Sequence, residues 1–359
     1  NGVNLPLVRV GESGVIRNVL AHYGINEEDE ERNAFIDERI DLQQRIIKRM
    51  QELGIYPVLD GFKGYVPHEI KEVVKTAQFV DGGIWQGTPK DPFIKLDDPF
   101  FTEYGKVFYE NQKELYGVQK FIDADPIVEG SAPAGASFGE LGKKIQNLII
   151  EAYPGATWVL QGWQDNPQPG LLEEAKRERV LVLDLWGEGR PQWKRADRFD
   201  LYKQTPWIWN ILNNFGGNTG MYGNLELVFN EPYKIREGEL GVMLCGLGTI
   251  MEGIENNPVV YHALYESAWL SAPPDIDNWL KDYAKSRYGA ISADAEKAWS
   301  ILNKTVYRST TDQQGPSENL MCARPGLDVK SVSTWGTSNL YYAPDSLLLG
   351  ISATHLFEW

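Results

Sequence analysis

The sequence predicts an α/β protein: a (β/α)8 barrel of the TIM type whose first βα unit is missing, followed by the start of an all-α domain. Three observations predict this class. Short apolar runs recur up to residue 248, amphipathic stretches with helical spacing lie between them, and after residue 272 helical stretches continue without strands. We therefore expect the barrel at 1–272 and a truncated helical domain at 273–359.

The predicted strands are almost continuously apolar rather than alternating, which is typical of strands covered on both faces in a parallel sheet. They are "VNLPLV" (3–8), "YPVLDGF" (56–62), "KFIDADPI" (120–127), "TWVLQGW" (157–163), "VLVLDLW" (180–186), "PWIWNIL" (206–212) and "GVMLCGLG" (241–248). Seven strands are one short of a barrel, and because the chain opens in a strand, we expect the missing unit to be the first. A doubly wound open sheet is the competing topology, but no GxGxxG follows an early strand.

Helices are predicted where apolar residues recur every three or four positions. The clearest, 37–54, carries a stripe of Ile and Met residues and ends at Gly54, a common helix terminator. The other predicted helices are 98–117 and 136–155 in the barrel and 272–289 and 291–308 in the helical domain.

Composition excludes several classes of function. A formal charge of −15 argues against nucleic acid or an anionic membrane as the main partner, because phosphate binding needs clustered Lys and Arg. The sequence contains no run of about 18 apolar residues, so it predicts no membrane span. Four scattered histidines and two cysteines, Cys245 and Cys322, form no metal-binding motif. We expect two free thiols and neither a metal nor a cofactor, whereas the oligomeric state stays open.

The aromatic content suggests a carbohydrate partner. The chain has 12 Trp and 17 Tyr, and an indole offers a flat apolar face with one polar edge, which suits a sugar ring. For any single Trp, packing in the core is the alternative.

Acidic, amide and indole side chains follow the predicted strands, and the carboxyl ends of barrel strands are where catalytic groups lie. These residues are Asp60, Asp123, Asp125, Glu129, Trp163, Asp184, Trp186, Glu188, Asn213, Asn214, Asn218 and Glu252. Two acids for the reaction, with aromatic and amide groups for the ring and its hydroxyls, are the components of a glycoside hydrolase site.

Several of these acids, and other residues near them, also have structural interpretations. Asp184 could orient neighbouring side chains, and Asp123 could cap the following helix or pair with a lysine. Glu255 fits a solvated position at a helix start, and His68 fits a helix cap. Glu188 and Glu226 stay undecided, and the Tyr and Trp residues of 261–283 are expected to pack between domains.

Specific blocks narrow the prediction. "NGVNLPL", "GYVPHEI", "VLQGWQDNP", "VLDLWGEGRPQW", "PWIWNILNNFGGNTGMYGNLE" and "EGIENNPVVYHALYESAW" closely resemble the α-N-acetylglucosaminidase family, glycoside hydrolase family 89. The resemblance runs over about residues 1–310 and more loosely to the end. It implies a small amino-terminal domain, a (β/α)8 barrel and a helical carboxyl-terminal domain, of which this chain would lack the first domain, the first strand and part of the last.

The resemblance also implies a retaining exo-hydrolase of terminal α-linked N-acetylglucosamine. The "AD…E" block makes Glu129 the acid/base, and "EGI" makes Glu252 the nucleophile. The implied substrate-binding residues are Trp85, Trp163, Trp186, Tyr65, Asp125, Asn213, Asn214 and Asn218. The relatives imply an extracellular or periplasmic location in a bacterium and a lysosomal one in animals.

Two departures from the family pattern leave alternatives open. Val128 precedes Glu129 where relatives often carry Asn or His, and Tyr65 stands where some relatives have His. Val128 is the one feature that supports the alternative function, a non-catalytic carbohydrate-binding protein with a decayed site, and the presence of both glutamates argues against it. A metal-dependent barrel hydrolase is disfavoured by the scattered histidines.

Overall fold

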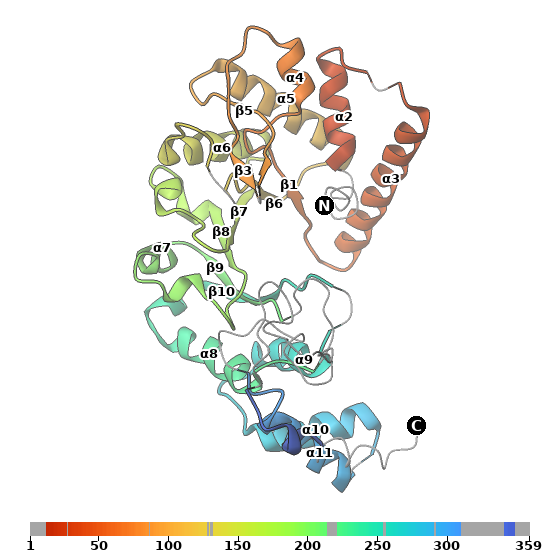
Figure 1. The fold of residues 1–359 in the computed structure, drawn as a ribbon, viewed down its shortest axis with the longest axis vertical. Coiled ribbons are helices and arrows are strands. Elements are labelled where there is room, and N and C mark those ends of the chain that lie inside the picture. Colours follow the sequence, from red (N-terminus) through yellow and green to blue (C-terminus); the bar gives the residue numbers. More distant parts are fainter. Residues whose placement is uncertain are drawn as a thin grey trace, which may run out of the picture. The chain divides into compact units, whose positions relative to one another are not determined.

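The chain folds into two compact units, Asn1–Val182 and Leu183–Trp359, and passes from one to the other inside strand β8 (Val180–Asp184) (Figure 1). The computed structural model describes residues 12–26, 28–85, 87–127, 129, 132–213, 221–253, 256–290, 292–309 and 341–348. The predicted strand at 3–8 lies outside these residues. The units divide the chain inside a strand, so the domain boundary at residue 272 stays a prediction.

Three parallel strands form the framework of the first unit. They are β1 (Val58–Asp60), β6 (Phe121–Asp123) and β7 (Thr157–Gly162), and β6 pairs with the other two. In register, Asp60 lies opposite Asp123. Parallel pairing therefore brings these two carboxylates to the same edge of the sheet, as the sequence predicts.

Two helices of this unit begin at an aspartate that caps the helix with its side chain. Asp29 accepts a hydrogen bond from the Arg32 N–H at the start of one helix, and Asp98 accepts one from Phe100 at the start of another. The helices of this unit are α2 (Glu12–His22), α3 (Glu30–Glu52), α4 (His68–Val73), α5 (Pro99–Tyr116) and α6 (Phe138–Ala152). The start predicted at residue 37 is wrong by seven residues, because the cap at Asp29 adds two turns.

Two short antiparallel pairs lie between α4 and α5 and are not predicted by the sequence. β2 (Phe79–Val80) pairs with β5 (Phe93–Ile94), and β3 (Ile84–Trp85) pairs with β4 (Thr88–Pro89). The second pair, called here the 84–89 hairpin, turns at Gly87, whose φ of +81° favours glycine. Both pairs belong to the long connection that follows β1.

The second unit contains parallel strands β9 (Trp207–Ile211) and β10 (Leu244–Thr249), close to the predicted runs. Trp207 and Trp209 are fully buried, as is Trp158 in the first unit, so the core takes part of the aromatic content. Helix α7 (Phe199–Gln204) precedes β9, α8 (Leu225–Glu237) lies between β9 and β10 in the chain, and α9 (Pro258–Ser267) follows β10. Short 3₁₀ segments lie at Pro169–Leu172 and Arg177–Arg179 in the first unit and at Gln192–Lys194 and Glu239–Val242 in the second.

Two further helices, α10 (Ile276–Tyr288) and α11 (Ala293–Lys304), confirm the predicted change to helical structure. Asp275 and Ser292 cap them, and Gly289 ends α10 in the left-handed conformation. The Trp279 ring lies 5.0 Å from Phe229 of α8, between centroids, and stacks on Tyr283 at 5.5 Å. This aromatic cluster packs the helical segment against α8, whereas Tyr265 and Trp269 are exposed. The packing between domains expected for the aromatic residues of 261–283 stays a prediction. Among the described residues, no helix is long and apolar enough to cross a membrane.

Candidate active site

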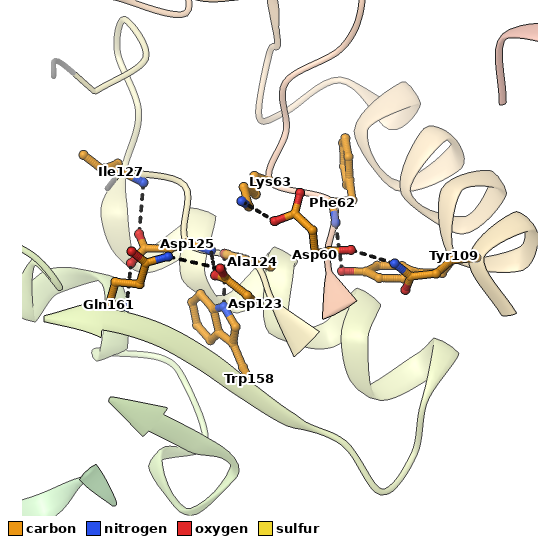
Figure 2. A network of polar contacts seen from close by, with 11 residues as sticks. Asp60, Phe62, Lys63, Tyr109, Asp123, Ala124, Asp125, Ile127, Trp158 and Gln161 are labelled. Carbon is orange, nitrogen blue, oxygen red and sulfur yellow. Dashed lines mark hydrogen bonds and ion pairs between the residues drawn. The ribbon is translucent and has the colours of Figure 1, made fainter. Parts of the chain in front are cut away.

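The carboxylates at the ends of β1 and β6 bind groups of the protein itself (Figure 2). Asp60 pairs with Lys63 at 2.6 Å. Asp123 accepts hydrogen bonds from the Asp125 N–H at 3.3 Å and from Gln161 Nε2 at 3.1 Å. The predicted cap or lysine pair of Asp123 is therefore wrong: its side chain joins the end of β6 to β7.

Asp125 has a structural role in the Glu129 loop, and its predicted contact with substrate stays a prediction. It is 2% exposed, and its two oxygens accept the backbone N–H of Ile127 at 3.1 Å and of Gln161 at 3.0 Å (Figure 2). Burial raises the pKa of its carboxyl group to about 6, against which these N–H donors act. Asp125 therefore shapes the loop that carries the chain from β6 towards Glu129.

Glu129 is held by two indoles from different segments. Trp85 Nε1, in the 84–89 hairpin, donates to Oε2 at 2.6 Å, and Trp163 Nε1, just after β7, donates to Oε1 at 2.8 Å. Lys90 Nζ donates to the backbone oxygen of Glu129 at 2.7 Å. The loops after β1, β6 and β7 thus converge on one half-buried carboxyl group, which the sequence selects as the acid/base.

The two indoles differ from the prediction in what they contact. Sugar stacking was predicted for both, but the structure directs the polar edge of each towards Glu129. Trp85 remains 45% exposed and Trp163 is half-buried, so parts of both residues stay accessible. Their role in binding a sugar stays a prediction.

Tyr65 and His68 lie on the connection that follows β1. The Tyr65 hydroxyl lies 3.3 Å from the Gly82 carbonyl oxygen and 3.4 Å from that of Pro126, so it ties the connection after β1 to the Glu129 loop. Burial raises the pKa of this phenol, which stays neutral. His68 is the first residue of α4, after the N-cap Pro67, and is exposed. The cap role predicted for His68 is therefore wrong, whereas the substrate contact of Tyr65 stays a prediction.

Two carboxyl groups at the end of β8 are buried in the second unit. Asp184 accepts the N–H groups of Gln192 at 3.3 Å and Trp193 at 2.9 Å, and burial raises its pKa to about 7. Glu188 Oε1 accepts the N–H groups of Leu212 at 2.9 Å and Asn213 at 2.7 Å, and burial raises its pKa to about 8. Both acids hold backbone segments in place, which for Asp184 is the orienting role left open by the sequence.

Asn213 is likewise a buried residue that hydrogen-bonds to other segments of the second unit. It is 2% exposed, with φ of +50°, a conformation that Asn adopts more readily than most residues. Its side chain donates to the Tyr222 carbonyl at 3.3 Å and accepts from Asn257 at 3.4 Å. Asn213 therefore belongs to a buried amide network, and its predicted substrate contact stays a prediction. Asn214 and Asn218 lie outside the described residues.

Trp186 does not present the open ring that stacking on a sugar requires. It is 3% exposed, and the Arg190 guanidinium carbon lies 5.3 Å from its ring centroid. Gly189 packs so closely that an added Cβ would lie 2.0 Å from the indole. Trp186 thus has a packing role, and its predicted contact with substrate stays a prediction.

Glu252 lies in the second unit, three residues after the carboxyl end of β10, and is exposed. Its role as nucleophile stays a prediction. Glu226, left undecided by the sequence, is exposed at the start of α8 and pairs with Arg308 at 2.5 Å. Glu255, Val128 and Cys322 lie outside the described residues, whereas Cys245 is a free, exposed thiol.

Sequence analysis missed Lys90 and Gln161, which contact the Glu129 loop. Gln161 had a detectable signal, because it stands two residues before Trp163 at the end of a strand. Lys90 had none, since it lies 39 positions from its partner. In the described part of the chain, no three His, Cys, Asp or Glu side chains gather as a metal site would require.

The raised pKa of Glu188 predicts a pH effect on stability. Below about pH 4.5, the pKa of Glu188 in the unfolded chain, this carboxyl group is protonated in both the folded and the unfolded state. Above that pH it ionises in the unfolded chain while it stays protonated in the folded protein. The free energy of unfolding therefore falls as the pH rises towards 8. Glu188→Gln removes this titration. We expect the difference in free energy of unfolding, variant minus natural protein, to rise by roughly 1–3 kcal/mol between pH 5 and pH 8.

Urea denaturation of both proteins at several pH values measures this difference. Asp184 is present in both proteins, so its own titration largely cancels. Parallel stability curves across this pH range would show that Glu188 is ionised in the folded protein.

The parallel strands, the helices between them and the carboxyl groups at the strand ends define a TIM-type α/β barrel protein, with a site on the face that such proteins use. The sequence model of the α-N-acetylglucosaminidase TIM-barrel domain matches residues 29–271, and that of the C-terminal domain of the same enzymes matches residues 279–355. The chain belongs to the α-N-acetylglucosaminidase family.

Individual relatives agree with this assignment. Human α-N-acetylglucosaminidase is 30% identical over 319 residues, covering 84% of this chain. A Clostridium perfringens family 89 glycoside hydrolase in complex with 2-acetamido-1,2-dideoxynojirmycin is 33% identical over 96% of this chain, with a TM-score of 0.87. A variant from the same organism with two Glu→Gln substitutions, in complex with its substrate GlcNAc-α-1,4-galactose, also has a TM-score of 0.87, at 32% identity over 96% of this chain. The chain spans 42% of the length of each of these relatives.

Proposed function

We propose that the protein is a retaining exo-glycosidase that hydrolyses terminal α-linked N-acetylglucosamine from glycans or glycoconjugates. The observation that carries the proposal is the carboxyl group of Glu129, presented by two indole N–H groups where the loops after three parallel strands converge. Membership of the family supports the substrate class, since the relatives include an enzyme bound to a GlcNAc-α-linked disaccharide.

In the proposed mechanism, Glu252 attacks the anomeric carbon as a carboxylate, and Glu129 gives its proton to the departing glycosidic oxygen. The resulting glycosyl ester on Glu252 is then hydrolysed by water, from which Glu129 takes a proton. Two inversions give net retention. We expect the two carboxyl groups to lie about 5–5.5 Å apart in the full protein, as in other retaining enzymes.

Two further proposals follow from the family. Residues 1–272 form the catalytic barrel, and residues 273–359 begin the helical domain, to which α10 and α11 belong. The protein acts outside the cytoplasm, in an extracellular or periplasmic space if it is bacterial, because its glycan substrates lie there.

The proposal is tested with the full-length protein and the two anomers of 4-nitrophenyl N-acetylglucosaminide. We expect turnover of the α anomer alone, with the α form of free N-acetylglucosamine appearing first by proton NMR. The β form appearing first would reject the retaining mechanism. Sugar binding by calorimetry without turnover would support the decayed-site alternative, and loss of activity with a chelator would indicate a metal-dependent hydrolase.

A further inference from the structure

The contact between Glu129 and its two indoles indicates more than a fixed position. An indole N–H can only donate, so both carboxyl oxygens of Glu129 act as acceptors here. The two N–O distances are 2.6 and 2.8 Å. Each carboxyl oxygen therefore has a neutral N–H donor aimed at it, and such hydrogen bonds are stronger when the carboxyl group is ionised.

We infer that Trp85 and Trp163 act as positioning residues that stabilise the carboxylate of Glu129 during catalysis. This inference rests on the proposed function, in which Glu129 begins the first step as a neutral acid and ends it as an anion. Negative charge therefore develops on its two oxygens as the proton moves to the leaving oxygen. Donors already aimed at those oxygens stabilise that charge without having to reorganise.

Neutral donors suit this role better than a cation would. A Lys or Arg paired directly with Glu129 would hold it ionised and deprive the first step of its proton. The neighbouring cation, Lys90, has its Nζ on the Glu129 backbone oxygen instead. Desolvation lowers the pKa of Lys90, and the nearby Glu129 carboxylate opposes that shift.

Other titratable groups of the neighbouring segments are accounted for. Tyr65 faces the site from the connection after β1 and stays neutral. Asp125, at the start of the Glu129 loop, has both oxygens on backbone N–H groups. Asp165 follows Trp163 and is exposed. Asp81, before the 84–89 hairpin, accepts from the Gly83 N–H, and Asp91, after Lys90, lies 3.8 Å from His68 and has a pKa raised by burial. Among the described residues, the two indoles donate directly to the Glu129 carboxyl oxygens.

Trp85→Phe and Trp163→Phe test the inference, because phenylalanine keeps an aromatic ring and removes the N–H. Trp269→Phe is the matched control, since Trp269 is 89% exposed and lies in the second unit. Each variant is made in the full-length protein. The substrates are two aryl α-N-acetylglucosaminides, with a 2,4-dinitrophenyl leaving group that needs no proton and a phenyl leaving group that does.

We expect each test variant to lose roughly tenfold to a hundredfold in kcat/KM on the phenyl substrate, the range of a hydrogen bond to a charged group. The dinitrophenyl substrate should lose far less. The alkaline limb of the kcat/KM profile, which reports loss of the Glu129 proton, should move to higher pH because the anion has lost a donor. Trp269→Phe should match the natural protein. Equal losses on both substrates with an unmoved limb would show a merely structural role and overturn the inference.

A second measurement does not depend on turnover. In protein labelled with ¹⁵N-tryptophan, the indole N–H resonances of Trp85 and Trp163 should titrate with one common pKa and lose that titration in Glu129→Gln. Common titration in an inactive protein would sustain the pairing while rejecting the proposed function. Independent or absent titration would overturn the pairing itself.

Discussion

Glu252→Ala is expected to lower kcat on aryl α-N-acetylglucosaminides by at least about a thousandfold, as loss of the nucleophile does in other covalent enzymes. The carboxylate is the group that forms the glycosyl ester, and alanine offers no atom to replace it. Added azide can enter the vacated space and attack the α-glycoside directly. Since that single displacement inverts the anomeric centre, the expected product is the β-glycosyl azide.

Azide product analysis by proton NMR distinguishes this role from a merely local defect. Glu226→Ala is the control, because Glu226 is also in the second unit and its exposed ion pair with Arg308 should contribute little. We expect that control to keep kcat within about twofold, in line with the small effect of surface ion pairs. Turnover unaffected by Glu252→Ala would reject Glu252 as the nucleophile.

Glu129→Ala is expected to reduce kcat/KM by about 10²- to 10⁴-fold for leaving groups that need a proton, the usual contribution of general acid catalysis. The dinitrophenyl substrate should still form the glycosyl ester, because its leaving group departs as a stable anion. The ester should then persist, since no base activates water. Azide attack on this intermediate gives the α-glycosyl azide, the opposite anomer to that from Glu252→Ala.

Stopped-flow release of dinitrophenolate, together with the anomer of the azide product, checks this prediction. A burst of phenolate followed by slow turnover is the expected trace. If both leaving groups lose activity equally, or the azide product is the β anomer, Glu129 does not act as the acid/base.

The amino-acid sequence alone determined the α/β class and most element positions. Continuous apolar runs identified β6, β7, β9 and β10, because strands covered on both faces need apolar side chains throughout. Local capping signals determined the helix ends, as with Asp98 and Gly117 around α5. The start of α3 was missed because its first turn is charged and lacks an apolar stripe, although Asp29 was a readable cap.

Only the tertiary structure decided the partners of the polar side chains. Asp125, Asn213, Trp186 and Tyr65 follow strands where site residues are expected, yet they are packed or bonded within the protein. Trp186 packs against Gly189 and Arg190 nearby, but Asp125, Asn213 and Tyr65 each have a partner more than 30 positions away, and no local pattern records which donor will meet which acceptor. Glu129 shows the same division: its residue type and motif are in the sequence, but its two indole partners, 44 and 34 positions away, are brought to it by folding, because desolvated carboxylate oxygens require donors wherever the chain can supply them.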